Sequence, residues 1–393
     1  MKEIKNHYHN LVIGFGKGGK TLAAYLARKG QDVVVIERSE MMYGGSCINV
    51  ACIPTKSLIT NAEKSRPYHE AMAIKDDLTS FLRQKNYDSL NNLPSVTIIT
   101  GHARFISKRE VRVLVHDSKE EAFITADRIF INTGTVPFIP EIPGIHNSNR
   151  VHTSTSMLEQ IGLPERLIIV GGGFIGLEFA DMYAKFGSEV TLLDRSESFL
   201  PMEDADMANE IYKAMTSKKI RIVTGAVVES IDSSTDGATV QYRRGAGEVE
   251  QTEGSAILVA TGRQPYLDEL DVDAAGIKLD AKGFIEVDDQ LKTNVENIWA
   301  IGDINGGPQF TYISLDDFRI IREINFLVDL TIRGRNEKRW PHPCLSRQVM
   351  PTSACGRRKQ ESKVILLKLP RFLRAPFPGQ GSSTPRKGCL RRW

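Results

Sequence analysis

The chain opens on an alternation of apolar and glycine-rich segments that predicts a βαβ unit. A short apolar strand at 11–13 leads into the hexapeptide GFGKGG at 14–19. A helical pattern follows over 20–28, and an apolar strand over 33–36 ends at Glu37. The change from a strand pattern to a helical period and back, with glycines at the first turn, is typical of a strand–helix–strand unit.

The same pattern recurs further along the chain. An apolar strand at 167–170 leads into GGGFIG at 171–176, a helical pattern covers 177–185, and a strand over 190–193 ends at Asp194. In both units the acidic residue comes 18 positions after the last glycine of the hexapeptide. The repetition predicts two related βαβ units rather than one chance match.

Both hexapeptides have the spacing Gly-x-Gly-x-x-Gly. The glycines are Gly14, Gly16 and Gly19 in the first unit and Gly171, Gly173 and Gly176 in the second. Such glycines allow a tight turn, close approach of the backbone to a pyrophosphate, and close helix–strand packing, and the terminal acid binds a ribose. Either copy alone could be an ordinary glycine-rich turn. Together the two copies indicate two dinucleotide sites.

The rest of the body fits an α/β fold of two Rossmann-like dinucleotide-binding domains, each with three layers. The pattern predicts a helix over 71–84, a strand over 96–100, a hairpin of 111–116 with 122–125, a meander of 220–224, 227–231 and 238–243, and a strand over 297–301. From about Phe326 onward no period of 3.6 or 2 persists.

Charge composition also distinguishes the body of the chain from its C-terminal tail. The 393 residues carry a formal charge of +3. Residues 331–393 hold 16 Lys and Arg but only two acidic residues. Residues 1–330 hold 35 Lys and Arg and 46 Asp and Glu. The body is therefore acidic and the tail strongly basic. With 41% hydrophobic residues the chain is too apolar for a disordered protein. Neither a secretory signal nor a membrane span is evident, so we expect a cytoplasmic protein.

Two of the five cysteines, Cys47 and Cys52, lie close together in the body. Four intervening residues allow a disulfide across about one helical turn, and a helix beginning after Gly44-Gly45 would lower the pKa of Cys47. A redox dithiol is the favoured interpretation. A metal site is the main alternative, although no second cluster of Cys or His is evident in the body, and inert thiols remain a third.

The segment GGSCINVACIPTK at 44–56 resembles the active-site segment of the FAD-dependent pyridine nucleotide-disulfide oxidoreductases, and the resemblance covers about residues 10–325. It implies an FAD domain interrupted by an NAD(P) domain. The expected boundaries are 1–150 and 271–325 for the FAD domain, 151–270 for the NAD(P) domain, and 326–393 for an irregular basic tail.

The resemblance also assigns cofactor residues. Those expected at FAD are Gly14, Gly16, Gly19, Glu37, Ser46, Lys56, Ala103, Thr133, Gly134 and Asp303, with Asn132 in place of the alanine that usually precedes the Thr-Gly pair. Those expected at the nicotinamide cofactor are Gly171, Gly173, Phe174, Gly176, Asp194, Arg195, Gly262 and Arg263. Asp194 favours NADH because a carboxylate repels a 2′-phosphate, whereas Arg195 could accommodate NADPH.

The implied reaction is a relay from NAD(P)H through FAD to a Cys47–Cys52 disulfide and on to a disulfide, a metal ion or another oxidant. Cys52 is expected beside the flavin, and Cys47 is expected to be the more exposed thiol that meets the acceptor. Lys56, paired with Glu178, is expected beside the flavin's reactive nitrogen. No protein-bound metal is expected.

The resemblance ends before the C-terminal dimerisation domain of the family, which supplies a catalytic histidine across a homodimer interface. His342-Pro343 is too early and lacks the following glutamate, so we interpret it as a chance dipeptide. The tail is typical of translation in another reading frame. Two alternatives to an active enzyme follow: an FAD-binding remnant that lacks its interface, or nucleic-acid binding through the basic tail, which we favour less.

Overall fold

The computed structural model describes residues 2–234 and 237–323, and these form the α/β fold that the sequence predicts. The predictions on the tail, including its reading frame, its His-Pro dipeptide and the homodimer interface, concern residues outside the described part. Among the residues described, no helix is both long enough and apolar enough to cross a membrane.

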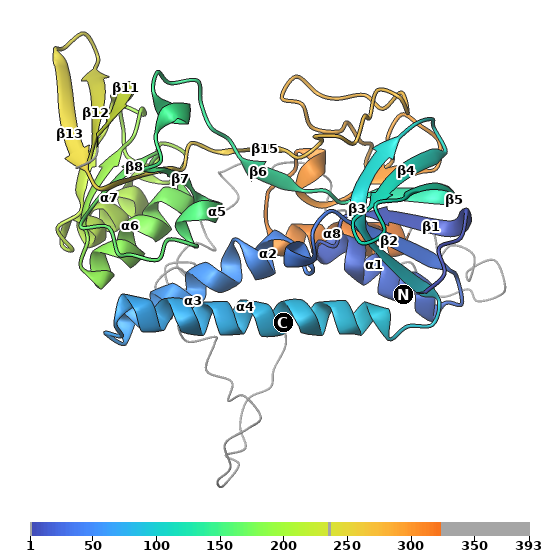
Figure 1. The fold of residues 1–393 in the computed structure, drawn as a ribbon. Coiled ribbons are helices and arrows are strands. Elements are labelled where there is room, and N and C mark those ends of the chain that lie inside the picture. Colours follow the sequence, from blue (N-terminus) through green and yellow to red (C-terminus); the bar gives the residue numbers. More distant parts are fainter. Residues whose placement is uncertain (1, 235–236, 324–393) are drawn as a thin grey trace, which may run out of the picture. The chain divides into compact units, whose positions relative to one another are not determined.

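The first sheet contains the first glycine-rich unit (Figure 1). Its strands are β1 (His7–Ile13), β2 (Val33–Glu37), β3 (Val96–Phe105), β4 (Glu110–Val115), β5 (Glu121–Ile131) and β16 (Ile298–Ala300). β1 pairs in parallel with β2 and β5, β2 with β3, and β5 with β16. β4 runs antiparallel between the outer parts of β3 and β5, which confirms the predicted hairpin.

The second sheet contains the second glycine-rich unit and is parallel throughout, in the order β10-β9-β8-β14-β7. Its strands are Arg221–Val223 (β10), Glu189–Leu193 (β9), Arg166–Val170 (β8), Ala256–Val259 (β14) and Val151–Thr153 (β7). The predicted meander is wrong in one strand, because β10 joins this sheet. The antiparallel sheet is instead formed by β11 (Ala226–Ser233), β12 (Ala238–Arg244) and β13 (Val249–Gly254).

The chain enters the second sheet after β5 and returns to the first at β16, so one domain interrupts the other, as expected. The two crossing segments pair with each other as β6 (Thr135–Pro137) and β15 (Arg263–Pro265).

The α-helices are α1 (Lys17–Arg28), α2 (Ser46–Asn49), α3 (Cys52–Glu63), α4 (Tyr68–Asn91), α5 (Ser154–Met157), α6 (Phe174–Phe186), α7 (Ala205–Thr216) and α8 (Thr311–Arg322). Short 3₁₀ helices cover Glu40–Met42, Ile145–Asn147 and Gly302–Asn305.

Burial explains why these segments become central strands. All five residues of β2 are buried, as parallel strands covered on both faces require. On one face Val33 and Val35 pack against Leu22 and Leu26 of α1. The other face of the sheet belongs to a separate core. Helices α3, α5, α7 and α8 were not predicted from the sequence.

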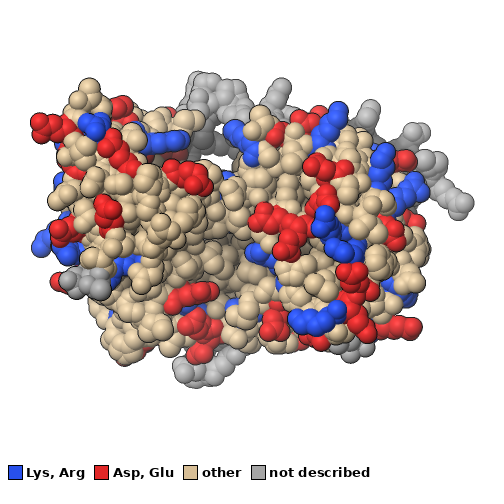
Figure 2. Space-filling model, turned by 45° about the horizontal axis from the view of Figure 1, so that its top comes forward, with Lys and Arg blue, Asp and Glu red and all other residues tan. Residues whose placement is uncertain are grey.

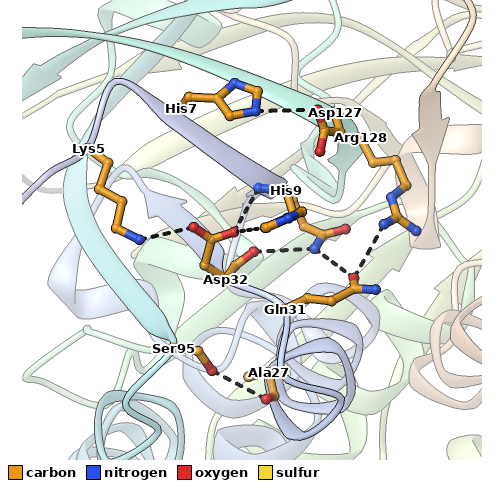
Figure 3. A network of polar contacts seen from close by, with 10 residues as sticks. Lys5, His7, His9, Ala27, Gln31, Asp32, Ser95, Asp127 and Arg128 are labelled. Carbon is orange, nitrogen blue, oxygen red and sulfur yellow. Dashed lines mark hydrogen bonds and ion pairs between the residues drawn. The ribbon is translucent and has the colours of Figure 1, made fainter.

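A polar network closes the amino ends of the first sheet (Figure 3). Asp32, just before β2, accepts hydrogen bonds from Nζ of Lys5 at 3.1 Å and from the backbone N–H of His9 at 2.8 Å. Gln31 accepts from Asn10 at 3.0 Å. The network joins β1 to the loop before β2 and leaves the carboxyl ends of the strands, where α/β sheets bind ligands, to the glycine-rich turn.

Candidate active site

The first glycine-rich turn is packed against one residue, Asn132, which follows β5. Gly14 has φ +103°, and a Cβ there would lie 2.3 Å from the backbone oxygen of Asn132. A Cβ at Gly16 would lie 2.6 Å from Oδ1 of the Asn132 side chain. Both positions therefore exclude any side chain. The sequence motif predicts the glycines, and the structure shows what they pack against.

Asn132 also links three separate segments. Its Oδ1 accepts the backbone N–H of Gly19 at 2.9 Å, and its Nδ2 donates to the carbonyl of Ile301 at 2.7 Å. The residue is buried, so both bonds replace contacts with water. Sequence reasoning noted Asn132 only as a departure from the usual alanine and missed this role. The departure itself was the available signal.

Glu37 ends β2 beside the same turn, where the first unit places its acid. Its carboxylate accepts the backbone N–H of Phe15 at 2.8 Å and that of Ser39 at 3.4 Å. Burial raises the pKa of Glu37 to about 7, and the two backbone hydrogen bonds only partly oppose that rise. The side chain is thus a buried acceptor at the position expected to bind a ribose.

The two cysteines lie on different helices. Cys47 is in the four-residue helix α2, whereas Cys52 is the first residue of α3. Ala51 lies between the two helices with φ −141° and ψ −106°, which is not a helical conformation. The expected single helical turn between the two cysteines is therefore wrong. No disulfide joins the two sulfurs in the structure, and they are close enough to share a hydrogen bond. The hydroxyl of Thr311, from α8, lies 3.7 Å from Sγ of Cys52.

The order of ionisation is the reverse of the prediction for Cys47. The hydrogen bond from Cys47 lowers the pKa of Cys52 to about 6, and Thr311 and the charge of Lys56 act in the same direction. The same hydrogen bond, together with burial, raises the pKa of Cys47. A four-residue helix does not overcome this coupling, whereas Cys52 begins a longer helix. Cys52 therefore loses the first proton.

The accessibility of the two thiols also differs from the expected order, because Cys52 is exposed and Cys47 is half-buried. Both thiols line the same cavity, so the exposed surface of Cys52 belongs to the cavity wall. This cavity has a volume of about 420 Å³. Cys52 therefore presents more exposed surface to the cavity than Cys47 does.

The cavity collects residues from the two glycine-rich units. The predicted site residues in its wall are Gly14, Gly16, Glu37, Ser46, Cys47, Cys52, Lys56, Ala103, Thr133, Gly134, Phe174, Glu178, Arg263 and Asp303. Those outside the wall are Gly19, Gly171, Gly173, Gly176, Asp194, Arg195 and Gly262. Lys56 of α3 forms an ion pair with Glu178 of α6, so the predicted pairing of these residues is present.

Arg263, in β15, lies in the wall of the cavity and contacts Thr135 of β6. Its Nε donates to Oγ1 of Thr135 at 2.8 Å, and its Nη2 donates to the Thr135 carbonyl at 2.6 Å. Oγ1 of Thr135 lies 3.3 Å from Asp303. Burial raises the pKa of Asp303, and the charge of Arg263 opposes that rise. Sequence reasoning missed Thr135, since no motif marks it.

The second glycine-rich turn has similar backbone contacts but a more open front. Gly171 has φ +114°, and a Cβ there would lie 2.4 Å from the backbone oxygen of Ala260. The carboxylate of Asp194 lies over Gly172, 2.4 Å from where a Cβ would stand. Gly173 has open space around it. Arg195 is exposed.

Phe174 begins α6 with 56% of its surface exposed in the cavity wall. The Lys56–Glu178 pair lies in the same wall. A large mobile ring at a helix start can move without disturbing a core, because it is not packed there. Phe174 therefore remains a candidate cover for a nicotinamide pocket, as the resemblance implies.

These features decide the family. Residues 8–317 match the family model described as pyridine nucleotide-disulphide oxidoreductase. The chain belongs to this family. Both glycine-rich turns lie within the matched residues, all of which except 235–236 belong to the described part of the chain.

Several family members are similar over most of the chain. The probable pyridine nucleotide-disulfide oxidoreductase RclA of Escherichia coli K12 is 44% identical over 318 residues, which cover 81% of this chain and 70% of RclA. Dihydrolipoyl dehydrogenase of Geobacillus stearothermophilus is 35% identical over 77% of this chain and 66% of its own length. Mercuric reductase of Bacillus cereus is 33% identical over 78% of this chain but only 50% of its own length.

Solved structures agree. The Cu(II) complex of the HOCl-induced flavoprotein disulfide reductase RclA from Escherichia coli matches with a TM-score of 0.77 and 43% identity, over 81% of this chain and 71% of that one. A second structure of the HOCl-induced flavoprotein disulfide reductase RclA from Escherichia coli matches with a TM-score of 0.76 and 42% identity, over 84% of this chain and 72% of that one.

The cavity fits the family's FAD. Oγ1 of Thr133 is buried in its wall, and nothing among the described residues pairs with it. Gly14 and Gly16 line the cavity just before α1, and a helix start suits a pyrophosphate. A bound FAD would be held by this turn, Glu37, Thr133 and Asp303.

Charge on the described part does not favour a polyanion. Figure 2 shows acidic and basic side chains interspersed over one face, with no continuous basic area there. Nucleic-acid binding through the basic tail concerns residues outside the described part. Within residues 2–234 and 237–323, no cluster of His, Cys, Asp or Glu is arranged to hold a metal ion.

Proposed function

We propose that this chain uses NAD(P)H to reduce a Cys47–Cys52 disulfide through bound FAD, and that the dithiol then reduces an external acceptor. The carrying observation is that both thiols and the residues of the first glycine-rich turn line one cavity of about 420 Å³. When bound, FAD would accept two electrons from the nicotinamide and pass them to the disulfide. The following roles belong to residues of the chain itself.

Cys52 is the thiol held as a thiolate in the reduced pair. Its pKa of about 6 lies below neutral pH, and Thr311 and Cys47 both donate hydrogen bonds toward it. Cys47 retains its proton in that state because its pKa is raised. The arrangement supports Cys52 as the thiol on the flavin side and Cys47 as the thiol that exchanges with the acceptor.

Lys56 supplies positive charge to the flavin side of the cavity. Its ion pair with Glu178 joins α3 of the first domain to α6 of the second. The pair therefore orients the ammonium and links the two nucleotide-binding units. We propose that Lys56 stabilises negative charge that develops near it when electrons enter the cavity.

The preferred nucleotide is NADH. Oδ1 of Asp194 accepts the backbone N–H of Ser196 at 3.2 Å, and the carboxylate lies over Gly172. A buried carboxylate at this place suits a ribose hydroxyl and repels a phosphate. Arg195 is exposed, so its charge at the site depends on how its side chain turns.

The acceptor is a disulfide, a metal ion or another oxidant that meets the dithiol. The similar proteins carry names that cover both chemistries, namely dihydrolipoyl dehydrogenase, mercuric reductase and a disulfide reductase with a Cu(II) complex. The alignment leaves about a third of the length of the first two relatives without a counterpart here, and half of the third. The complete activity of any one of them is therefore a proposal for this chain.

Turnover of the FAD-loaded protein tests the proposal. Oxidation of NADH and of NADPH is followed with a panel of small disulfides and of divalent metal ions, in the parent and in Cys52→Ser. We expect faster oxidation of NADH than of NADPH, and long-wavelength absorption that appears under NADH in the parent only. A protein that binds no FAD, or that gives equal turnover in parent and variant, contradicts the proposal.

A further inference from the structure

Lys20 is a partly buried lysine that the proposed reaction has not used. It lies in the first half of α1, and its Nζ donates a hydrogen bond to Oδ1 of Asn86 on α4. The amide of Asn86 is itself fixed, because its Nδ2 donates to the carbonyl of Leu82 at 2.7 Å. The ammonium group is therefore held in one place rather than free in solvent.

This place adjoins the loop that carries Cys47. A Cβ at Gly45 would lie 2.7 Å from Cα of Gly16, and a Cβ at Gly44 would lie 3.4 Å from Cγ of Asn86. The two glycines thus lie between the start of α1 and the side chain that binds Lys20. Cys47 follows them by two residues, in α2. Lys20 and Cys47 are close enough for each to act on the pKa of the other through its charge.

The charge of Lys20 is not cancelled. Its side-chain partner is a neutral amide, and no carboxylate in residues 2–234 or 237–323 forms an ion pair with it. Lys56 differs, because Glu178 pairs with it. Burial and the charge of Lys17 lower the pKa of Lys20 to about 8, and the nearby Cys47 opposes that fall; in turn, Lys20 lowers the pKa of Cys47. Each thiol thus has its own lysine, since Lys56 acts on Cys52.

We propose that Lys20 stabilises the thiolate of Cys47 during exchange with the acceptor, as a positioning residue that acts through Cys47. The role of Lys20 in exchange with an acceptor rests on the proposed function. Cys47 needs such help because ionising it places a second negative charge beside Cys52. A fixed and uncancelled positive charge offsets this repulsion.

With a disulfide as acceptor, exchange begins at Cys47. The proton of Cys47 passes to solvent, its sulfur forms a bond to one acceptor sulfur, and the acceptor S–S bond breaks. The departing thiolate takes a proton from solvent. Cys52 then attacks Cys47, which re-forms the Cys47–Cys52 disulfide and releases the second acceptor thiolate. The dithiol is oxidised and the acceptor is reduced by one electron pair.

Alkylation of Cys47 tests this without turnover. The Cys52→Ser protein, loaded with FAD, is treated with iodoacetamide across a range of pH, and the rate is read on the Cys47 peptide by mass spectrometry because the tail holds other cysteines. Adding Lys20→Met is expected to raise the apparent pKa of Cys47 by about one unit and to slow alkylation about tenfold at neutral pH. Lys20→Arg should keep the parent profile.

Two further variants make the result decisive. Asn86→Asp keeps the hydrogen-bond geometry but places a carboxylate on Lys20, so it should slow alkylation as Lys20→Met does, even if the Met variant folds poorly. Lys29→Met, an exposed lysine after the same helix, is the matched control. Unchanged profiles in both Lys20→Met and Asn86→Asp would overturn the proposal. An altered profile in a protein that does not turn over would leave Lys20 coupled to Cys47 and reject only the proposed function.

Discussion

The two glycine-rich turns have the same sequence spacing but different surroundings. In both, a Cβ at the first glycine would strike the backbone oxygen of the residue after a central strand, Asn132 in one and Ala260 in the other. At the second glycine the turns diverge. Gly16 faces the side chain of Asn132, whereas Gly173 faces open space. The side chain of Asn132 fills the space beside Gly16 in the first turn. Ala260, at the matching position of the second turn, leaves the space beside Gly173 open.

The two turns also differ in how they are tied to the rest of their domains. Asn132 ties the turn to Gly19 and Ile301, so the first site is built into the core of its domain. The second turn has no such link from Ala260, because an alanine side chain forms no hydrogen bonds. The first turn is therefore tied to two other segments of its domain by hydrogen bonds that the second turn lacks at the matching position.

The largest effect is expected from one substitution made in both turns. Gly16 and Gly173 are both N-cap residues with negative φ, −66° and −76°, so alanine is allowed at each by the backbone. Gly16→Ala should destabilise the protein by about 4 kcal/mol and weaken FAD binding, since Asn132 must move. Gly173→Ala should cost less than about 1 kcal/mol. Urea unfolding measures both.

A second substitution checks the cause of that asymmetry. In the double variant Gly16→Ala with Asn132→Ala, the new methyl group has room, so the two costs should not add. Costs that add, or equal losses from Gly16→Ala and Gly173→Ala, would show that Asn132 does not distinguish the turns.

The next effect is a pH dependence confined to the first turn. The pKa of Glu37 is raised to about 7 from 4.5, so the folded state binds its proton more tightly than the unfolded state. Glu37 therefore makes its full contribution to the free energy of unfolding below pH 4.5, and this contribution is lost as the pH rises through 7. In FAD-free protein, Glu37→Gln should therefore gain up to about 3 kcal/mol relative to the parent between pH 4.5 and 8. A constant difference between the two proteins across that range would contradict the raised pKa.

The smallest of the three effects comes from making the first turn resemble the second. Asn132→Ala leaves the N–H of Gly19 and the carbonyl of Ile301 without their partner, which should cost about 2 kcal/mol in thermal or urea unfolding. The cavity beside Gly16 should then admit a methyl group. No loss of stability would mean that water replaces both hydrogen bonds fully.

The sequence predicts what local geometry determines. The glycine spacing and the terminal acids Glu37 and Asp194 follow from the backbone of a βαβ turn, so they could be predicted without a structure. The role of Asn132 depends on Ile301, 169 positions away, and that of Thr311 on Cys52, 259 positions away. No local pattern encodes such contacts. The break at Ala51 was missed for a related reason, because it depends on how α3 packs rather than on spacing.

The central claim is that FAD and the Cys47–Cys52 pair exchange electrons in this chain. An anaerobic reductive titration of the FAD-loaded, oxidised protein tests it most directly. The parent should take up two electron pairs per chain, one for the flavin and one for the disulfide, and Cys52→Ser should take up only one. A parent that takes up a single pair, as Cys52→Ser does, would show that the two groups do not exchange electrons.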